Sequence, residues 1–480
     1  MHNVNLIWFR NDLRTLDNPA LYFACKNNTL KIILALFIST PKQWKQNVIS
    51  PRKISLIYEN IIYLQKKLNQ LGIHFFYHES SDYLDSINYI SSFCHVHHVT
   101  SIFFNCEYGF LEYKRDKIVK QKLKRKNISI NTFHDSTLIE PDIIKSKKNT
   151  VYKSYSHFKK KYILELKKNI PKCFSIPIKN NFENHSNLLF KIPKFSINFD
   201  DFDHDLFPIG EDSVLNVLKL FLKNNFSIYS HDNNLLNMNV TSLLSPHLSI
   251  GVISSRQCIN LLLKKYPNVI NSLDTCSWIN ELIWREFYKY LLYFYPDFYQ
   301  KNNIYSWEHK IKWNQNSYHF KLWKQGQTGY PIVDAGIKQL RQLGWINNRL
   351  RMILASFLVK NLLIHWKQGE RYFMSKLIDG DYASNNGNWR WMSSIDMDHV
   401  PYFRIFNPML QSKKFDKHAK YIRKYIPELK NTSISDIHNP CNLNKIKKIC
   451  FKYPMPMVNY YHSRNNTLLV LKRAKYELNK

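Results

Sequence analysis

Short apolar segments with the pattern of β-strands alternate with helical patterns in the first third of this 480-residue chain. Such strand-like segments are almost absent from the helical region that follows. Apolar runs typical of buried strands span Val4 to Phe9, Lys31 to Ile38, Ile73 to Tyr77 and Val99 to Asn105. Between them, residues 50–71 and 112–126 have the spacing of helices. Because this alternation is typical of a parallel sheet covered by helices, we predict a doubly wound α/β domain at the N-terminus.

Long helical patterns dominate after Glu211, among them Trp278 to Tyr295 and Asn347 to Trp366. The stretch before them is rich in Lys, Asn, Ser and Pro without a sustained period, as expected of a long, partly irregular surface connector. A chain of this length exceeds one ordinary hydrophobic core. We therefore predict an α/β domain over 1–130, a connector over 131–210 and an all-helical domain over 211–480.

The charge balance is strongly basic, with 69 Lys and Arg against 36 Asp and Glu and a formal net charge of +33. An excess of this size favours a polyanionic partner such as nucleic acid. A second explanation stays open, because Lys, Asn, Ile, Tyr and Phe are all abundant, as in proteins from AT-rich genomes. The charge alone therefore does not identify a ligand.

The 8 cysteines form no CxxC pair, so neither a structural zinc nor a disulfide framework is indicated. The segment Cys94 to His98 has metal-ligand residue types, but in an extended segment its neighbours would point to opposite faces. The N-terminus has no signal-peptide pattern, and no run of about 18 apolar residues suggests a membrane helix. We expect a cytoplasmic protein with free thiols, no metal and no membrane anchor.

Two polar segments interrupt the apolar helical region, Trp345 to Met352 and Leu377 to Trp391. Their amide, guanidinium, carboxylate and indole groups would be costly to bury without partners, so we expect them to line a polar ligand. A third pattern places Glu281, Trp284, Arg285 and Tyr288 at i, i+3, i+4 and i+7, on one face of a helix.

These segments, with Leu6 to Arg14 and Pro401 to Pro408, resemble the photolyase and cryptochrome family of flavoproteins over nearly the whole chain. The pattern is most similar to bacterial class I cyclobutane pyrimidine dimer photolyases. The resemblance implies a helical FAD-binding C-terminal domain and a monomeric carbon-carbon lyase that repairs DNA containing pyrimidine dimers. In that reaction fully reduced FAD, excited by light, gives an electron to a dimer flipped out of the duplex, as photolyases do.

The resemblance also assigns a flavin site. Its implied contacts are Tyr229, Thr241, Ser242, Leu243, Leu244, Ser245, Trp278, Arg285, Arg351, Asp379, Gly380, Asp381 and Asn385. The hydroxyls and amides of 241–245 precede a helix and suit a diphosphate, although Leu243 stands where relatives often have Arg. Arg351 and Asp379 would form an ion pair over the isoalloxazine ring. Such a pair is tolerated inside a protein only when both members are hydrogen-bonded.

Asn385 is the residue that most favours repair over signalling. An uncharged amide beside flavin N5 can accommodate the anionic reduced flavin without supplying a proton. Plant-type cryptochromes carry Asp at this place and many animal ones Cys. By the same resemblance, Trp389, Trp366 and Trp313 form a relay that re-reduces oxidised flavin, from the innermost ring to the outermost.

The dimer and its DNA would meet residues from several helices. By resemblance, Glu281 hydrogen-bonds the thymine edge, Trp284 stacks on it, and Arg349 meets a backbone phosphate. The remaining implied DNA contacts are Tyr288, Asn348, Met352 and Gln411.

Three alternatives stay open: a blue-light sensor of the cryptochrome type, a 6-4 photoproduct photolyase and a degenerate flavoprotein. The 6-4 enzymes have His where this chain has Asn347. Glu112 resembles the carboxylate that holds the pterin of a 5,10-methenyltetrahydrofolate antenna in many bacterial relatives. Leu111, Tyr299 and Gln300 depart from the pattern around it, so we expect folate binding to be weak or absent.

Overall fold

The computed structural model describes residues 3–26, 31–178, 190–232, 236, 240–297, 308–398, 404–439 and 453–476. The chain forms two compact units, each assembled from separate stretches of sequence. The first unit consists of Met1–Phe226, Ser242–Gln300 and Ile378–Ala383, and the second of Ser227–Thr241, Lys301–Leu377 and Ser384–Lys480. Among the helices that the structure describes, none has the length and apolar character needed to cross a membrane.

The first unit contains a parallel five-stranded sheet in the order β3-β2-β1-β4-β5. Its strands are β1 (Asn3–Phe9), β2 (Lys31–Ser39), β3 (His74–Glu79), β4 (Val99–Asn105) and β5 (Ser129–Phe133). In the central register, Leu6 pairs with Leu34 on one side and with Ile102 on the other. The predicted doubly wound parallel sheet is confirmed, but β5 was not predicted.

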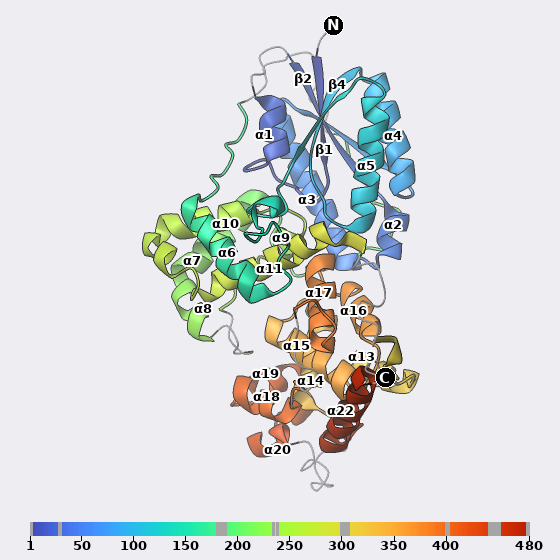
Figure 1. Cartoon of the computed structure of the whole chain (residues 1–480), viewed down its shortest axis with the longest axis vertical. Helices are drawn as coiled ribbons and strands as arrows, with labels where there is room; N and C mark the ends of the chain where they lie inside the picture. Colours follow the sequence, from blue (N-terminus) through green and yellow to red (C-terminus); the bar gives the residue numbers. More distant parts are fainter. Residues whose placement is uncertain are drawn as a thin grey trace. The chain divides into compact units, whose positions relative to one another are not determined.

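Helices cover both faces of the sheet (Figure 1). They are α1 (Pro19–Cys25), α2 (Pro41–Gln46), α3 (Pro51–Gln70), α4 (Tyr83–Val96) and α5 (Phe110–Lys124). Apolar side chains of α4 and α5, such as Ile90 and Val119, pack with Leu6, Leu36 and Ile102 of the strands. The segment Cys94 to His98 therefore ends a helix and does not form the extended segment that we expected. No group of three or more His, Cys, Asp or Glu within the described ranges is placed to hold a metal.

In the described part of the segment 131–210 lie the helix α6 (Tyr155–Lys168), a short 3-10 turn at Pro141–Ile143 and a stretch that runs along α3. Gln65 and Tyr58 of α3 donate hydrogen bonds to the carbonyls of Phe190 and Ile192. Further helices of this unit are α7 (Glu211–Asn224), α9 (Ser245–Ser249), α10 (Ser255–Lys265) and α11 (Ser277–Phe294). The predicted boundary at 210 falls just before α7, whereas the one at 130 falls inside β5, and the division into three sequence segments stays a prediction.

The described elements of the second unit are mainly helical and pack around an apolar core. Its main helices are α13 (Ser317–Gln325), α14 (Pro331–Leu343), α15 (Asn348–Ser356), the π-helix η4 (Phe357–Asn361), α16 (Trp366–Met374), most of α17 (Tyr382–Ser393), α18 (Pro408–Phe415), α19 (Lys420–Tyr425), α20 (Ile434–His438) and α22 (Tyr460–Tyr476). The single helix predicted over 347–366 is wrong. After α15 the chain widens into η4 and then turns at Leu363, whose φ is +54°.

Lys360 of η4 is buried in this core, where Nζ donates to Ser394 Oγ at 2.9 Å. Burial, helped by the positive charge of Lys475, lowers the pKa of Lys360 to about 7. In the unfolded chain the ordinary Lys value returns, so between pH 7 and 10 the unfolded state binds more protons than the folded state. Stability should therefore rise with pH in this range.

We predict that Lys360→Met removes that contribution. The free energy of unfolding of the native chain should gain up to about 1.4 kcal/mol per pH unit relative to the variant between pH 7 and 10. Urea unfolding followed by Trp fluorescence at pH 6.5, 8 and 9.5 measures the difference. Parallel pH profiles of the two proteins would contradict the prediction.

Candidate functional site

Helix α11 begins beside the predicted flavin loop. Trp278, in its first turn, packs against Phe221 with ring centroids 5.3 Å apart, and its Nε1 donates to Ser242 Oγ at 3.3 Å. Ser242 and Leu243 lie before Leu244, the N-cap of the short helix α9, and Leu243 has a φ of +51°. A left-handed conformation at a residue with a side chain is strained, and such residues cluster at ligand sites. The loop thus places the Ser242 hydroxyl close to α11. It does so although Leu243 stands where relatives often have Arg.

Trp284 lies on the predicted face of α11, and one side of its ring is covered. Tyr155, the first residue of α6, stacks on Trp284 with centroids 3.4 Å apart and an interplanar angle of 5°. The Tyr155 hydroxyl donates to the carbonyl of Asn280 at 3.3 Å, which ties α6 to the same helix. Tyr288 lies next to the ring, with centroids 5.8 Å apart. Sequence reasoning missed Tyr155, which precedes Trp284 by more than a hundred residues.

The next turn of α11 is held by buried polar contacts. Arg285 donates to the carbonyls of Ser136 and Leu248, at 3.0 and 3.3 Å, and to Ser255 Oγ at 3.2 Å. The adjacent carboxylate of Glu286 accepts from the backbone N–H of Leu138 at 2.7 Å and from Ser255. Burial raises the pKa of Glu286, while Arg285 opposes that rise. Arg285 therefore uses several of its N–H groups in hydrogen bonds that fix α11 against its neighbours.

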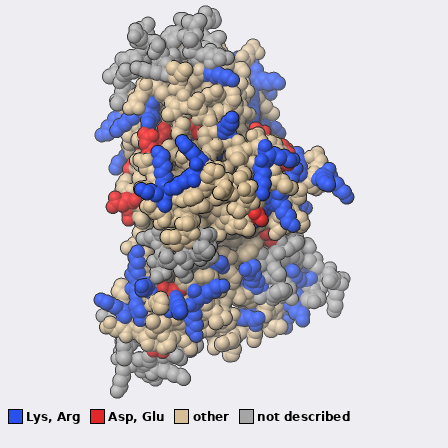
Figure 2. All heavy atoms as spheres, turned by 90° about the vertical axis from the view of Figure 1, so that its left-hand side faces the viewer, with Lys and Arg blue, Asp and Glu red and all other residues tan. Residues whose placement is uncertain are grey.

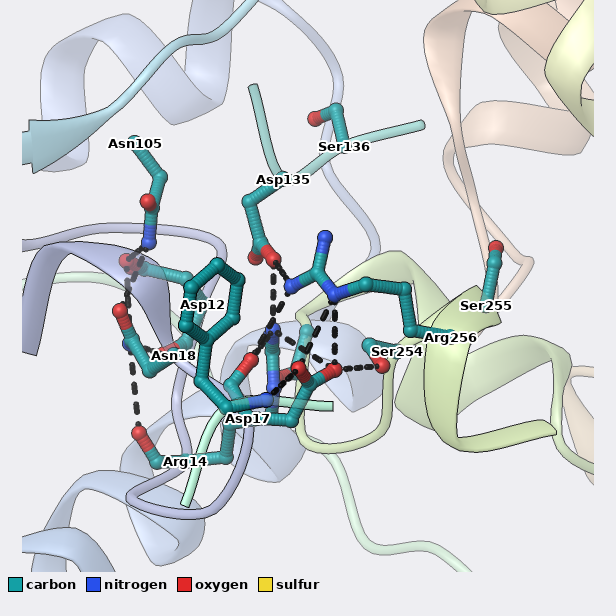
Figure 3. A network of polar contacts seen from close by, with 12 residues as sticks. Asp12, Arg14, Asp17, Asn18, Asn105, Asp135, Ser136, Ser254, Ser255 and Arg256 are labelled. Carbon is teal, nitrogen blue, oxygen red and sulfur yellow. Dashed lines mark hydrogen bonds and ion pairs between the residues drawn. The ribbon is translucent and has the colours of Figure 1, made fainter. Parts of the chain in front are cut away.

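A second buried network fixes α10, which supplies Ser255 (Figure 3). Asp135 pairs with Arg14 at 2.7 Å and also with Arg256, whose Nε reaches Asp17 at 2.9 Å. Burial alone would raise the pKa of Asp135, but the two guanidinium groups lower it to about 2. Asp12, which lies in the segment that follows β1, accepts a hydrogen bond from the Asn105 side chain at 2.6 Å. The family-like segment from Leu6 to Arg14 thus has a structural role.

The segment Asp379–Asp381 contacts two lysines that the sequence analysis did not select. Lys53 of α3 donates to the carbonyl of Gly380 at 2.6 Å, and Lys289 of α11 lies 3.5 Å from an Asp381 oxygen. Burial lowers the pKa of Lys53 to about 8, against the attraction of Asp381 and Asp379. Lys289 could have been predicted from the sequence, because it lies one turn beyond Arg285 on the same helix face. No sequence pattern pointed to Lys53.

In the second unit, Asn385 is oriented by Glu370, mainly through the backbone carbonyl of that residue. Its Nδ2 donates to the carbonyl of Glu370 at 3.0 Å and lies 3.5 Å from Glu370 Oε1. Burial raises the pKa of Glu370 to about 7, although Lys367 acts in the opposite direction. Since the amide nitrogen faces Glu370, the amide oxygen is the group that remains for a second partner. Such an oxygen can accept a hydrogen bond but cannot release a proton.

The three tryptophans of the predicted relay all belong to the second unit. Trp389 and Trp366 are 2% and 1% exposed, whereas Trp313 is half-buried. His365 lies between the outer two, with centroids 5.9 Å from Trp366 and 5.1 Å from Trp313. The Arg390 guanidinium lies 4.8 Å over the Trp366 ring. Two of the three rings are thus buried and Trp313 is the most exposed of them, while the order of the relay and its electron-transfer role stay predictions.

Trp389 has two further neighbours that sequence reasoning missed. A Cβ on Gly369 would come within 2.2 Å of its ring, so only glycine fits at that position. The buried ring of Trp323 lies at a centroid distance of 6.4 Å. Both contacts fix the position of the innermost indole.

Helix α15 carries three of the residues predicted to meet DNA, Asn348, Arg349 and Met352. Asn347 is its N-cap and accepts from the backbone N–H of Arg349 at 2.8 Å, so its amide starts the helix. The Arg349 guanidinium lies 4.8 Å over the ring of Phe415. Met352 packs at the edge of the core, and Gln411 lies on α18. Their roles toward DNA stay predictions.

The predicted site residues fall in both units. Ser242, Leu243, Leu244, Ser245, Trp278, Glu281, Trp284, Arg285, Tyr288, Asp379, Gly380 and Asp381 belong to the first unit, and Tyr229, Thr241, Asn348, Arg349, Arg351, Met352, Asn385 and Gln411 to the second. The Arg351–Asp379 ion pair would join the units and therefore stays a prediction. Arg351 Nε donates to the carbonyl of Ile346 at 3.0 Å.

Glu112, the predicted folate ligand, lies in the first turn of α5. It accepts a hydrogen bond from the Tyr83 hydroxyl at 2.7 Å, and the Arg115 guanidinium lies 4.7 Å over the Tyr83 ring. Burial raises the pKa of Glu112, and the nearby charge of Glu107 adds to the effect. Leu111 is exposed beside it, while Tyr299 and Gln300 lie outside the described residues.

Comparison with family models gives two matches. Residues 5–175 match the family described as DNA photolyase, and residues 278–473 match the FAD binding domain of DNA photolyase. The chain is 60% identical to the deoxyribodipyrimidine photo-lyase of Buchnera aphidicola subsp. Baizongia pistaciae, over 98% of this chain and 99% of that protein. It is 37% identical to the enzyme of the same name from Escherichia coli K12, over 98% and 99% of the two chains.

Solved structures with the same fold include a photolyase and a cryptochrome. The bacterial class III photolyase of Agrobacterium tumefaciens gives a TM-score of 0.83 at 29% identity, covering 99% of this chain and 98% of that one. The cryptochrome of Synechocystis sp. PCC6803 gives 0.86 at 27% identity, covering 98% and 99%. The fold itself therefore does not separate repair from signalling.

Proposed function

The chain belongs to the DNA photolyase family, and on that basis we propose that it is a deoxyribodipyrimidine photo-lyase, a lyase that splits cyclobutane pyrimidine dimers in DNA with light. The observation that carries the proposal is 60% identity over almost the full length of a relative with that name. The predicted repair function agrees with the names of the curated relatives.

The residues present fit FAD. The chain has the FAD-binding domain of the family, and its flavin loop offers the Ser242 hydroxyl beside a left-handed turn at Leu243. Reduced FAD, when bound, supplies the electron that opens the dimer. The amide oxygen of Asn385 would accept a hydrogen bond at the flavin while Glu370 holds the amide in place. Lys53, which is buried, and Lys289, which is partly buried, hold the Asp379–Asp381 segment.

The dimer would bind on the Glu281 and Trp284 face of α11. Tyr155 keeps the Trp284 indole in a fixed plane, so its ring loses little freedom when a base stacks on it. Glu281 lies one turn earlier and can accept from the N–H groups of a pyrimidine edge. A dimer is poorly stacked in the duplex, which lowers the cost of flipping it into such a site.

Surface charge supports a DNA partner. On the face shown in Figure 2, Lys and Arg side chains are more widespread than Asp and Glu. Arg349, which is partly exposed, and the exposed lysines Lys413 and Lys414 of α18 also contribute positive charge to the surface. Phosphate contacts of this kind hold DNA without reading its sequence, as a lesion-directed enzyme requires.

We also propose that the protein acts as a cytoplasmic monomer. Within the described residues the cysteines Cys25, Cys94, Cys106, Cys173, Cys258 and Cys276 are free thiols, which agrees with a reducing compartment. Sedimentation at micromolar concentration should give the mass of a single chain.

One experiment separates this function from the two nearest alternatives. Reduced protein is illuminated with one oligonucleotide that contains a cyclobutane dimer and another that contains a 6-4 photoproduct. We expect the first lesion to disappear and the second to remain, because Asn347 caps α15 and offers no acid-base imidazole. Loss of neither lesion would favour a sensor, and loss of the 6-4 lesion would favour the other repair class.

We predict that the purified protein carries far less than one equivalent of methenyltetrahydrofolate. Glu112 already has Tyr83 as a partner, and Leu111 offers no hydrogen bond where Asn is usual. Each polar atom of the folate that is buried without a hydrogen-bond partner lowers the binding free energy by about 1 to 3 kcal/mol. Two such unpaired atoms would weaken folate binding by about a hundredfold or more. Absorbance after release of the chromophores measures occupancy.

The matched variant for this prediction is Leu111→Asn, which restores the usual amide. It should raise folate occupancy when the protein is refolded or expressed with excess folate, without changing FAD content. A full equivalent of folate in the native protein would show the prediction to be wrong.

A further inference from the structure

A cavity of about 550 Å³ lies within the second unit, apart from the flavin and DNA residues described above. Its walls come from the segment before α13, the end of η4 and the start of α22. Polar lining residues include Lys312, Asn314, His319, Asn361, His462 and Asn466. None of the lining residues that the structure describes is acidic.

The chemistry of this cavity favours a small organic anion that also carries hydroxyl groups. Lys312 supplies a positive charge, and the asparagine amides and histidine rings supply hydrogen-bond donors for carboxylate or enolate oxygens. Helix α22 adds Ser463 to the same wall. A purely apolar ligand would leave these groups unpaired, at a cost for each one.

Two buried atoms of the cavity residues lack a protein partner. Asn361 is 5% exposed and donates from Nδ2 to Ser463 Oγ at 3.1 Å, but its Oδ1 has no hydrogen bond. His319 Nδ1 is likewise buried without one. Buried polar atoms are rarely left unsatisfied, so each such atom calls for an explanation. Both atoms belong to residues that line the cavity, although neither atom is itself open to solvent.

The segment that carries the outermost tryptophan of the predicted relay also forms part of the cavity wall. Lys312 and Asn314, the neighbours of Trp313 in sequence, both line it. Asn314 is fixed by two hydrogen bonds, from its backbone N–H to the Leu363 carbonyl at 2.8 Å and from Nδ2 to the Leu362 carbonyl at 3.2 Å. The same short segment thus carries the half-buried indole and forms a wall of the cavity.

We propose that this cavity binds a small hydroxylated organic anion of the enediol class, which returns an electron to Trp313. The inference rests on the proposed relay role of Trp313. In the step, one electron passes from the bound enediolate to the oxidised indole, which is restored to its resting state. The enediolate becomes its one-electron radical, and its hydroxyl proton leaves to solvent. A bound donor would make re-reduction independent of chance collisions at the Trp313 edge.

The test uses the holoprotein with oxidised FAD and ascorbate as the probe. The rate of flavin photoreduction is measured against ascorbate concentration, and ascorbate binding in the dark is measured by equilibrium dialysis. We expect the rate to saturate at the concentration that fills the site in the dark. Lys312→Gln and Asn361→Ala should each raise the half-saturating concentration about tenfold, the effect of roughly 1.4 kcal/mol.

Lys321→Gln is the matched control, because Lys321 is an exposed lysine of α13 that does not line the cavity. It should leave both the photoreduction curve and the dark binding unchanged. Rates that rise linearly with ascorbate and do not change in the two cavity variants would overturn the proposal, as would absence of dark binding. If the chemically reduced native protein did not repair dimers, the proposed function would be wrong. The result of the dark-binding measurement would not depend on that outcome.

Discussion

Trp389→Phe is expected to reduce photoreduction of oxidised FAD to the level of a dark control while leaving repair by chemically reduced protein intact. Phenylalanine fills most of the space beside Gly369 and Phe373, so the fold should survive, but a benzene ring is far harder to oxidise than an indole. Repair requires an electron on the flavin and does not depend on the route by which it arrived. Flavin absorbance under illumination measures the first effect, and dimer loss after dithionite reduction measures the second.

Trp323→Phe serves as the matched control for this prediction. Trp323 is as buried as Trp389 and lies against it, but it is not one of the three relay residues. We expect this variant to retain photoreduction. If Trp389→Phe abolished repair in the chemically reduced protein as well, Trp389 would be a structural residue and the relay assignment would fail.

Trp284→Ala should weaken binding of dimer-containing DNA by about ten- to a hundredfold, because aromatic stacking on a base is worth about 1 to 3 kcal/mol. FAD content should not change, since the flavin loop is tied to α11 through Trp278, nearly two turns earlier. Titration of a labelled dimer oligonucleotide against an undamaged one measures the loss of discrimination.

Tyr155→Phe is the control for the stacking argument. It keeps the ring on Trp284 and removes only the hydroxyl that donates to Asn280, so dimer binding should stay close to native. Tyr155→Ala should resemble a mild form of Trp284→Ala, because the indole is no longer held in one plane. Unaltered discrimination between damaged and intact DNA in Trp284→Ala would remove this residue from the site.

The sheet was predictable where its strands are apolar, and unpredictable where they are not. The strands β1 and β2 are buried along almost their whole described length, and β4 is buried over its last four residues, so all three carry mainly apolar residues in the sequence. The edge strand β5, Ser129–Phe133, is exposed or partly buried throughout and carries alternating polar residues, so no apolar run marked it. The break between α15 and α16 was hidden for a different reason. Leu363 adopts a left-handed φ that its residue type does not favour, and tertiary packing imposes it.

The candidate site was predictable where chemistry follows a helical period or a family motif. Glu281, Trp284 and Arg285 share a face of α11 as expected, and Asn385 is held by hydrogen bonds as a functional amide would be. Tyr155 and Lys53 were not found, because each reaches the site region from a helix far away in sequence. A contact between distant segments leaves no local pattern, so only the three-dimensional structure reveals it.

Light-dependent repair of a defined lesion tests the central claim most directly. The purified, chemically reduced protein is mixed with an oligonucleotide that contains one cyclobutane thymine dimer, and the strand is analysed after near-ultraviolet or blue illumination and after darkness. The account predicts that illuminated dimers return to two intact thymines with many turnovers per protein, and that dark samples keep the dimer. Dimers that persist under illumination, in protein shown to contain reduced FAD, would contradict the account.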